Sequence, residues 1–172
     1  TIPADMVIMA AGVRSSTELA VQAGLKIGET GGVWTDATMR TSNPDIYAAG
    51  DMVESLNLVS GKKVRIPLAG SANKQGRAAG CNAAGGKLLF KGVLGTAIIK
   101  VGELTAARTG LNTREAEALG WDFESVYVPG FSHATYYPDA MPMVLKLTVA
   151  KQDGRVLGAQ GIGRKGVDKR ID

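Results

Sequence analysis

Cysteine and histidine are almost absent from this chain, whose 172 residues include one of each. One cysteine excludes an internal disulfide framework, and a lone histidine without cysteines beside it does not favour a metal site. Aromatic residues make up only 5% of the chain. The two densest basic clusters, residues 62–65 and 165–170, contain none of them. Basic patches without interleaved aromatics are typical of a solvated surface rather than of a nucleic-acid site.

Long hydrophobic runs are also lacking. No apolar stretch reaches the length needed to cross a membrane, and the N-terminal residues lack the charged and apolar regions of a signal peptide. We therefore expect a cytoplasmic protein with no membrane and no nucleic-acid partner. The 45% of hydrophobic and 21% of charged residues are typical of a globular protein, and the length suits one domain or two small ones.

A third absence concerns the glycines that bind nucleotides. We predict no Gly-x-Gly-x-x-Gly turn for a nucleotide, because the one match to that spacing, residues 161–166, follows a predicted hairpin strand rather than the first strand of a βαβ unit. Residues 158–163 (Gly-Ala-Gln-Gly-Ile-Gly) are rich in glycine, but their first two glycines are spaced wrongly. They also follow a predicted hairpin strand and open no helix, so this segment is not predicted to bind a dinucleotide.

Cys81 lies in a stretch of small residues, 71–84, that we predict to be a helix ended by the two glycines at 85 and 86. A free cysteine in such a helix is usually a small core residue, because a reactive thiol needs an electropositive and accessible setting. We therefore predict a structural role for Cys81.

The most informative stretch is residues 41–51, Thr-Ser-Asn-Pro-Asp-Ile-Tyr-Ala-Ala-Gly-Asp. Its Asn-Pro-Asp segment is typical of a turn, and residues 46–49 are an apolar run of strand length. Gly50 has no side chain, so another molecule can approach the backbone closely. Ligands of open α/β sheets bind beyond the carboxyl ends of the strands. Asp51 is therefore placed to accept hydrogen bonds from ligand hydroxyls.

A second candidate binding feature is the start of the small-residue helix, at Pro67, Leu68, Ala69 and Gly70. A helix N-terminus carries unpaired N–H groups and about half a positive charge. The small residues allow a ligand atom to come within bonding distance of these groups. The alternative is a helix that is merely packed closely on its neighbours.

Residues 41–51 closely resemble the second flavin-binding motif of the FAD-dependent pyridine nucleotide-disulfide oxidoreductases. Other stretches resemble the same family in order along the chain: residues 5–14 its last NAD-domain strand, 66–77 the segment under the isoalloxazine ring, and 133–140 and 166–172 its dimerisation domain. The last two are similar to the branch of coenzyme A-disulfide reductases, NADH oxidases and persulfide reductases. One departure is visible: Ser15 and Ser16 follow Arg14 where the family usually has Pro-Asn.

The resemblance implies both fold and cofactors. The expected fold class is α/β plus α+β: residues 1–90 would supply the end of an NAD-binding domain and the C-terminal half of a Rossmann-like FAD-binding domain, and residues 91–172 an α+β dimerisation domain, incomplete at its C-terminus. FAD would contact Gly50 and Asp51 through its ribityl chain, and residues 67–70 through its ring. NAD(P)H would be the co-substrate. A plain α+β domain without a partner is the alternative for residues 91–172.

The lone histidine, His133, precedes two adjacent tyrosines, Tyr136 and Tyr137. A lone histidine is more often structural than catalytic, and paired tyrosines before a proline usually pack or form a turn. In the resembling branch, however, a tyrosine of this region reaches across the homodimer to the partner's redox cysteine. The resemblance therefore implies a catalytic role for Tyr136 or Tyr137, whose phenol can donate a hydrogen bond to a thiolate.

These implications predict a function. The parent protein would pass hydride from NAD(P)H through FAD to a cysteine-linked disulfide or persulfide, or to oxygen or peroxide. The family's glycine turns and redox cysteine are not in the sequence, so we expect a C-terminal fragment that is inactive alone and binds FAD weakly. The alternative is a non-catalytic homodimerisation or assembly module.

Local signals predict the remaining elements. We expect a buried strand at residues 6–10 and a helix at 17–24 with Thr17 as its cap. The Asn112–Glu115 spacing predicts a capped helix, and Gln-Asp-Gly at 152–154 predicts a hairpin turn. The other predicted strands are residues 33–39, 62–66, 96–101, 103–108, 122–128, 143–150 and 155–160.

Overall fold

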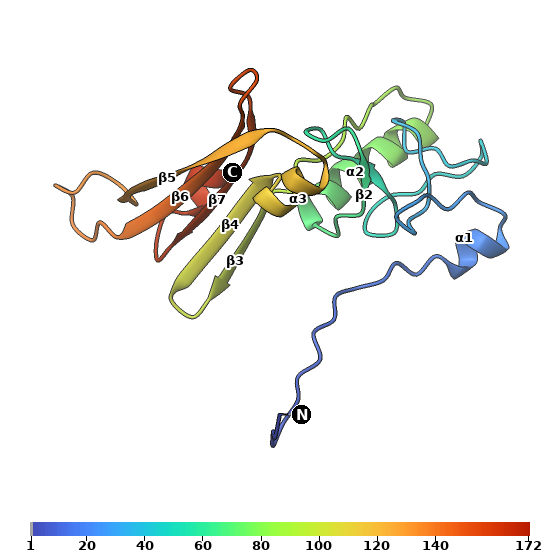
Figure 1. The fold of residues 1–172 in the computed structure, drawn as a ribbon. Helices are drawn as coiled ribbons and strands as arrows, with labels where there is room; N and C mark the ends of the chain where they lie inside the picture. Colours follow the sequence, from blue (N-terminus) through green and yellow to red (C-terminus); the bar gives the residue numbers. More distant parts are fainter. Residues whose placement is uncertain (1) are drawn as a thin grey trace.

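The computed structural model describes residues 2–172. An extended N-terminal segment leads into a loop-rich first region, and an antiparallel sheet with two short helices forms the second region (Figure 1). The sheet and helix α2 (Ala69–Ala83) lie on opposite sides of the connection between the regions.

The first region contains little regular structure besides α2. Its other elements are α1 (Glu18–Gln22), β1 (Ser55–Leu56) and β2 (Lys63–Val64), the two strands pairing antiparallel. Single bridges join the loops, among them the parallel pair Val33–Val53. The core of this region is a cluster of buried apolar side chains: Ala20, Val33, Met39, Ala48, Val53 and Ala78.

Helix α2 is rich in alanine, which favours helix formation. It buries Gln75, Ala78 and Asn82, whose spacing of three and four residues places them on one face. Gly85 follows its C-terminus with a φ of +86°, a left-handed conformation that glycine adopts without strain. The helix therefore packs through one narrow stripe and leaves its N-terminus accessible.

The second region is a five-stranded sheet in the order β3-β4-β7-β6-β5, with every neighbouring pair antiparallel. Its elements are β3 (Ala97–Val101), β4 (Leu104–Gly110), α3 (Thr113–Ala118), β5 (Phe123–Phe131), β6 (Pro142–Ala150), β7 (Val156–Gly163) and α4 (Asp168–Ile171). A register irregularity lies between Thr148 and Val149.

Helix α4 covers one face of the sheet, where Val167 and Ile171 pack against Ala107 and Met143. Because side chains alternate along a strand, the residues next in sequence to Ala107 and Met143 point to the opposite face of the sheet. The exposed apolar residues on that opposite face include Ile99, Leu104, Phe131, Val144 and Ile162. We call these five residues the open apolar face.

Several sequence predictions are confirmed. Asn112 caps α3 through a complete capping box. The Asn112 side chain accepts from the N–H of Glu115, and the Glu115 carboxylate accepts from the N–H of Asn112. The hairpin at residues 152–154 joins β6 to β7. Residues 158–163 lie within β7, as expected for a segment that is not a nucleotide turn.

The buried strand predicted at residues 6–10 is wrong. The segment forms no strand, and its apolar side chains are exposed, Ile8 by 83%. A strand needs a neighbour to complete its hydrogen bonds, and within residues 2–172 no strand lies beside this one. The apolar run therefore has nothing to pack against.

The strands predicted at 33–39 and 46–49 shrink to single bridges, at Val33 and Tyr47. The carboxylate of Asp36 accepts hydrogen bonds from the N–H groups of Thr38 and Arg40, which curls the chain into a turn. Met39 adopts a φ of 67° there. Local side-chain bonding therefore replaces the ladder.

Two smaller predictions also fail. Thr17 makes no side-chain capping bond to α1, because its backbone is not in the extended conformation of a capping residue. Cys81 is exposed rather than in the core. It lies outside the face of α2 formed by Gln75, Ala78 and Asn82, so the packing of the helix does not reach it.

Candidate functional site

The Gly50–Asp51 turn lies against α2. Gly50 has a φ of +88°, and its N–H donates a hydrogen bond to Oε1 of Gln75 at 2.8 Å. If a Cβ were placed on Gly50, its nearest neighbour would be the Cβ of Ala72, at 3.9 Å. The packing of the turn on α2 thus fixes the backbone that carries Asp51, while the Asp51 side chain is exposed.

A second contact reaches the turn from the N-terminal segment. The hydroxyl of Ser15 donates to the carbonyl oxygen of Asp51 at 2.9 Å. Arg65 holds this segment in turn, because its guanidinium donates to the Ser15 hydroxyl at 3.3 Å and to the carbonyl oxygen of Val13 at 3.1 Å. The Asp51 carboxylate itself has no hydrogen bond or ion pair within residues 2–172.

The N-terminus of α2 offers unpaired donors. Leu68 precedes the helix with an extended backbone and makes no side-chain cap. Within the described chain, the N–H groups of Ala69, Gly70 and Ser71 have no acceptor. Pro67, Ala69 and Gly70 are exposed, and no atom lies within 4 Å of a Cβ placed on Gly70. A ligand oxygen can therefore reach these groups.

The predicted site residues thus form one accessible edge: the turn of Gly50 and Asp51 lies beside the first turns of α2, which begin at Ala69 and Gly70. A free carboxylate accepts hydrogen bonds from hydroxyls, and free N–H groups with the helix dipole donate to a carbonyl oxygen. A flavin presents a chain of hydroxyls next to a ring with carbonyl oxygens. The residues present therefore fit this group.

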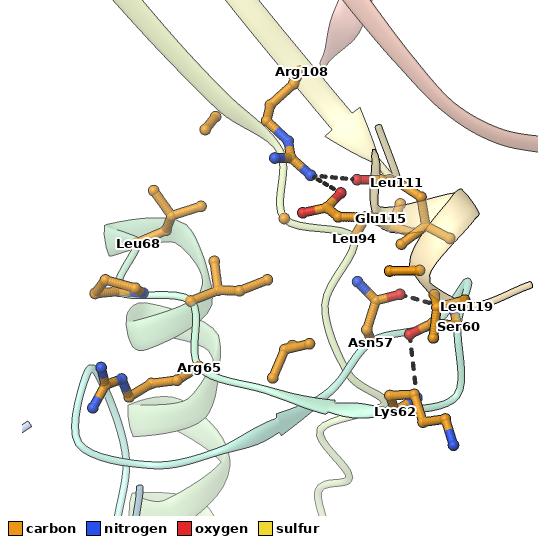
Figure 2. Close-up of a pocket in the computed structure, with 17 residues that line it drawn as sticks. Asn57, Ser60, Lys62, Arg65, Leu68, Leu94, Arg108, Leu111, Glu115 and Leu119 are labelled. Carbon is orange, nitrogen blue, oxygen red and sulfur yellow. Dashed lines mark hydrogen bonds and ion pairs between the residues drawn. The ribbon is translucent and has the colours of Figure 1, made fainter. Parts of the chain in front are cut away.

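A cavity of about 570 Å³ lies beside this edge, between β2 and the second region. Figure 2 shows Leu68 and Arg65 on one side of it and Arg108 on the other. Arg108 donates to the carboxylate of Glu115 at 2.6 Å and to the carbonyl oxygen of Gly110. The cavity shares Pro67 and Leu68 with the predicted flavin site, so it continues the same edge.

The loop that carries Tyr136 and Tyr137, residues 132–141, lies away from this edge. Tyr136 and Tyr137 are 83% and 60% exposed on the β5–β6 connection, at the far end of the sheet from α2 (Figure 1). Their ring centroids are 4.8 Å apart. His133 braces this loop: Nε2 donates to the carbonyl oxygen of Pro138 at 3.0 Å, and in the neutral ring Nδ1 accepts from the hydroxyl of Ser132.

The sequence reasoning missed three buried or bridging polar residues. Gln75 and Glu54 are nearly fully buried, and Ser15 bridges two segments. The Glu54 carboxylate accepts from the hydroxyl of Thr30 at 3.1 Å and lies where a Cβ on Gly28 would be. The position of Gln75 on the buried face of α2, three residues before Ala78, could have indicated a buried polar contact. Nothing local marked Ser15, whose partner is 36 residues away.

Two classes of feature are not found in the described residues. No group of three or more His, Cys, Asp or Glu side chains among residues 2–172 is arranged to hold a metal ion. No helix of that part of the chain is long and apolar enough to cross a membrane.

Comparisons with known proteins place the two regions in one family. Residues 1–76 match the profile of the pyridine nucleotide-disulphide oxidoreductases, and residues 96–172 match the profile of their dimerisation domain. The first region is thus part of an FAD/NAD-binding domain and the second a dimerisation domain with an antiparallel sheet. This confirms the predicted fold class.

Relatives match across nearly the whole chain. A CoA-dependent NAD(P)H sulfur oxidoreductase of Pyrococcus furiosus is 43% identical over 98% of this chain and 38% of its own length. An NAD-dependent persulfide reductase from A. fulgidus superposes with a TM-score of 0.94 and 51% identity, over 99% of this chain and 32% of its own.

An FAD-dependent pyridine nucleotide-disulphide oxidoreductase from Desulfovibrio vulgaris superposes with a TM-score of 0.81 and 41% identity, over 96% of this chain and 39% of its own. The chain therefore spans less than two fifths of the length of each of these relatives. It belongs to the pyridine nucleotide-disulphide oxidoreductase family, in the branch of the coenzyme A disulfide reductases, persulfide reductases and NADH oxidases.

Proposed function

We propose that this chain is part of a homodimeric, FAD-dependent NAD(P)H oxidoreductase. Its electron acceptor would be a cysteine-linked disulfide or persulfide of coenzyme A type, or oxygen or peroxide. Residues 1–90 would contribute to the nucleotide-binding domains and residues 91–172 to the dimer. The names of relatives that reduce coenzyme A polysulfide or disulfide, or oxidise NADH, support this range of acceptors.

One observation carries the proposal: the free Asp51 carboxylate and the unpaired N–H groups of Ala69 and Gly70 lie along one accessible edge. A hydroxyl-rich chain joined to a carbonyl-bearing ring satisfies both sets of groups. A turn or a helix with no ligand would not need a free carboxylate and unpaired N–H groups side by side.

Each part of the edge has its own role. The Asp51 carboxylate would accept hydrogen bonds from the ribityl hydroxyls and so orient the chain that leads to the ring. The first-turn N–H groups of α2 would donate to a carbonyl oxygen of the ring. Their partial positive charge stabilises negative charge on that edge, which favours electron uptake. Bound there, FAD supplies the hydride-transfer chemistry between NAD(P)H and the acceptor.

We propose that two copies of this chain associate through the second region. The match to a dimerisation domain and the open apolar face support this. A hollow of about 640 Å³ on that face is lined by residues that include Leu104, Phe131, Val144 and Ile162. Contiguous apolar surface of this kind is typical of a protein interface. Tyr136 or Tyr137 would then reach the active site of the partner, where a phenol can donate to a thiolate.

We expect these 172 residues alone to oxidise no NAD(P)H and to bind FAD weakly and reversibly, because the contacts assigned above reach the ribityl chain and ring but not the ADP half. Riboflavin carries both of the contacted parts. It should therefore compete with FAD for the chain, whereas ADP should not.

The test is a titration of FAD into the chain, followed by flavin fluorescence. Asp51→Asn should weaken binding about tenfold, the usual effect of losing hydrogen bonds to a charged group. Asp45→Asn, an exposed carboxylate in the preceding turn, is the matched control and should change nothing. Competition by ADP but not by riboflavin, or tight retention of stoichiometric flavin on purification, would contradict the proposal.

A further inference from the structure

The Gly50–Asp51 turn is tied to two different segments, one at each end. We propose that Gln75 and Ser15 are positioning residues that fix this turn so that the Asp51 carboxylate faces the ligand. Gln75 bonds the N–H of Gly50, and Ser15 bonds the carbonyl oxygen of Asp51. The proposal rests on the proposed flavin function, because it takes flavin hydroxyls as the ligand of Asp51.

Gln75 is only 2% exposed, and its side-chain amide is bonded at both ends. Oε1 accepts from Gly50 at 2.8 Å, while Nε2 donates to the hydroxyl of Ser55 at 2.7 Å. The Gly50 N–H can only donate and therefore needs an acceptor, so Oε1 must point toward it and the amide has one orientation. An apolar side chain here would leave the Gly50 N–H unpaired, which is costly in a buried setting.

Ser15 acts from the opposite direction. Its hydroxyl donates to Asp51 at 2.9 Å and accepts from the guanidinium of Arg65 at 3.3 Å.

The two bonds leave the carboxylate free while they fix its backbone. Asp51 is exposed, and its carboxylate has no partner within residues 2–172. A group that is held in its binding geometry before the ligand arrives loses less entropy on binding. Gln75 also comes from α2, the helix whose N-terminus begins at Ala69. Gln75 therefore fixes the position of the Gly50–Asp51 turn relative to the N–H groups at the start of α2.

Ser15→Ala tests the first contact in the full chain by NMR. The carbonyl carbon resonance of Asp51 should move, because its hydrogen bond is lost, and FAD affinity should fall several-fold. Ser16→Ala is the matched control, since Ser16 is exposed and next in sequence. Ser15→Thr keeps a hydroxyl and should restore both readouts, which a loss of general stability would not explain.

Gln75→Leu tests the second contact. Hydrogen exchange of the Gly50 amide should become about tenfold faster, as expected for one lost hydrogen bond. Gln75→Glu keeps an acceptor for this amide and should restore slow exchange. Lys74→Leu, an exposed neighbour on α2, is the control. If Gln75→Leu fails to fold, Gln75→Glu and the Ser15 variants still decide the question.

The outcomes separate this inference from the proposed function. Unchanged Asp51 and Gly50 signals in the variants would overturn the inference. Changed signals with unaltered FAD affinity would also overturn it, and the proposed function would stand if Asp51→Asn still weakens binding. Changed signals together with weakened FAD binding support it. If no form of the chain responds to FAD, the proposed function fails, and with it the positioning role, while the two bonds to the turn remain established.

Discussion

Gly158 of β7 lies directly against the backbone of Leu111, the residue before the cap of α3, and a Cβ on Gly158 would occupy the position of the Leu111 carbonyl oxygen. The N–H of Leu111 donates to the carbonyl oxygen of Leu157 at 2.9 Å. The backbone before α3 thus lies directly on the backbone of β7, and this close approach requires a residue without a side chain at position 158.

Gly158→Ala should therefore destabilise the chain by about 3 kcal/mol, because backbone must move to admit the methyl group. Gly130→Ala in β5 is the matched control, since no atom lies within 4 Å of its Cβ position. Urea unfolding followed by circular dichroism measures both. Equal, small effects of the two substitutions would contradict the packing of β7 on Leu111.

Ile8→Lys should change the free energy of unfolding by less than about 0.5 kcal/mol, because an exposed side chain without contacts contributes little. Val33→Lys, which places a charge in the core of the first region, should be severely destabilising. Thermal unfolding of both variants gives the comparison. A large loss for Ile8→Lys would mean that residues 6–10 are buried in solution.

Asp36 should make stability depend on acid pH. Burial alone would raise the pKa of Asp36, but bonds from the Thr38 hydroxyl and from the N–H groups of Arg40 and Thr38, with the Arg40 charge, lower it below its ordinary value of 3.8. A carboxylate with a lowered pKa in the folded state stabilises above its unfolded pKa. Its contribution is lost as pH falls through the folded value.

Asp36→Asn should therefore cost up to about 1 kcal/mol at neutral pH, since the group is exposed, and the difference from the unsubstituted chain should shrink below pH 3.8. Urea midpoints at several pH values measure this. Thr38→Val, which removes one donor, should reduce the pH-dependent difference. A difference that grows on acidification would show that the sign is wrong.

Val144→Glu should dissociate the proposed dimer, because it places a charge at the centre of the open apolar face. Leu19→Glu on α1 is the control, because it places the same charge on an exposed apolar residue away from the sheet. Sedimentation velocity should find the Leu19 variant as dimeric as the unsubstituted chain, and the Val144 variant monomeric. A dimer that survives Val144→Glu would place the interface elsewhere.

The sequence predicted best where the signal was local. The capping box at Asn112 and Glu115, the helix around Gln75 and the hairpin at 152–154 each depend on residues close in the chain. The strand at residues 6–10 failed because apolar residues indicate burial only when something is present to bury them. Val33 and Tyr47 fell short of strands because an aspartate bonded the backbone between them.

The candidate site was predictable in part. The Gly50–Asp51 turn and the start of α2 were recognisable as motifs, and the structure places them side by side. The residues that join them were not, because the bonds of Gln75 and Ser15 span 25 and 36 positions of sequence. Such contacts are set by the tertiary fold rather than by local preference.

The flavin site can be tested most directly by amide NMR shifts of the isotope-labelled chain during a riboflavin titration. Flavin binding at the proposed edge predicts that the largest shifts occur at Asp51, Ala69 and Gly70, and that Asp51→Asn reduces them. Shifts confined to other residues, or none at all, would contradict flavin binding at this edge.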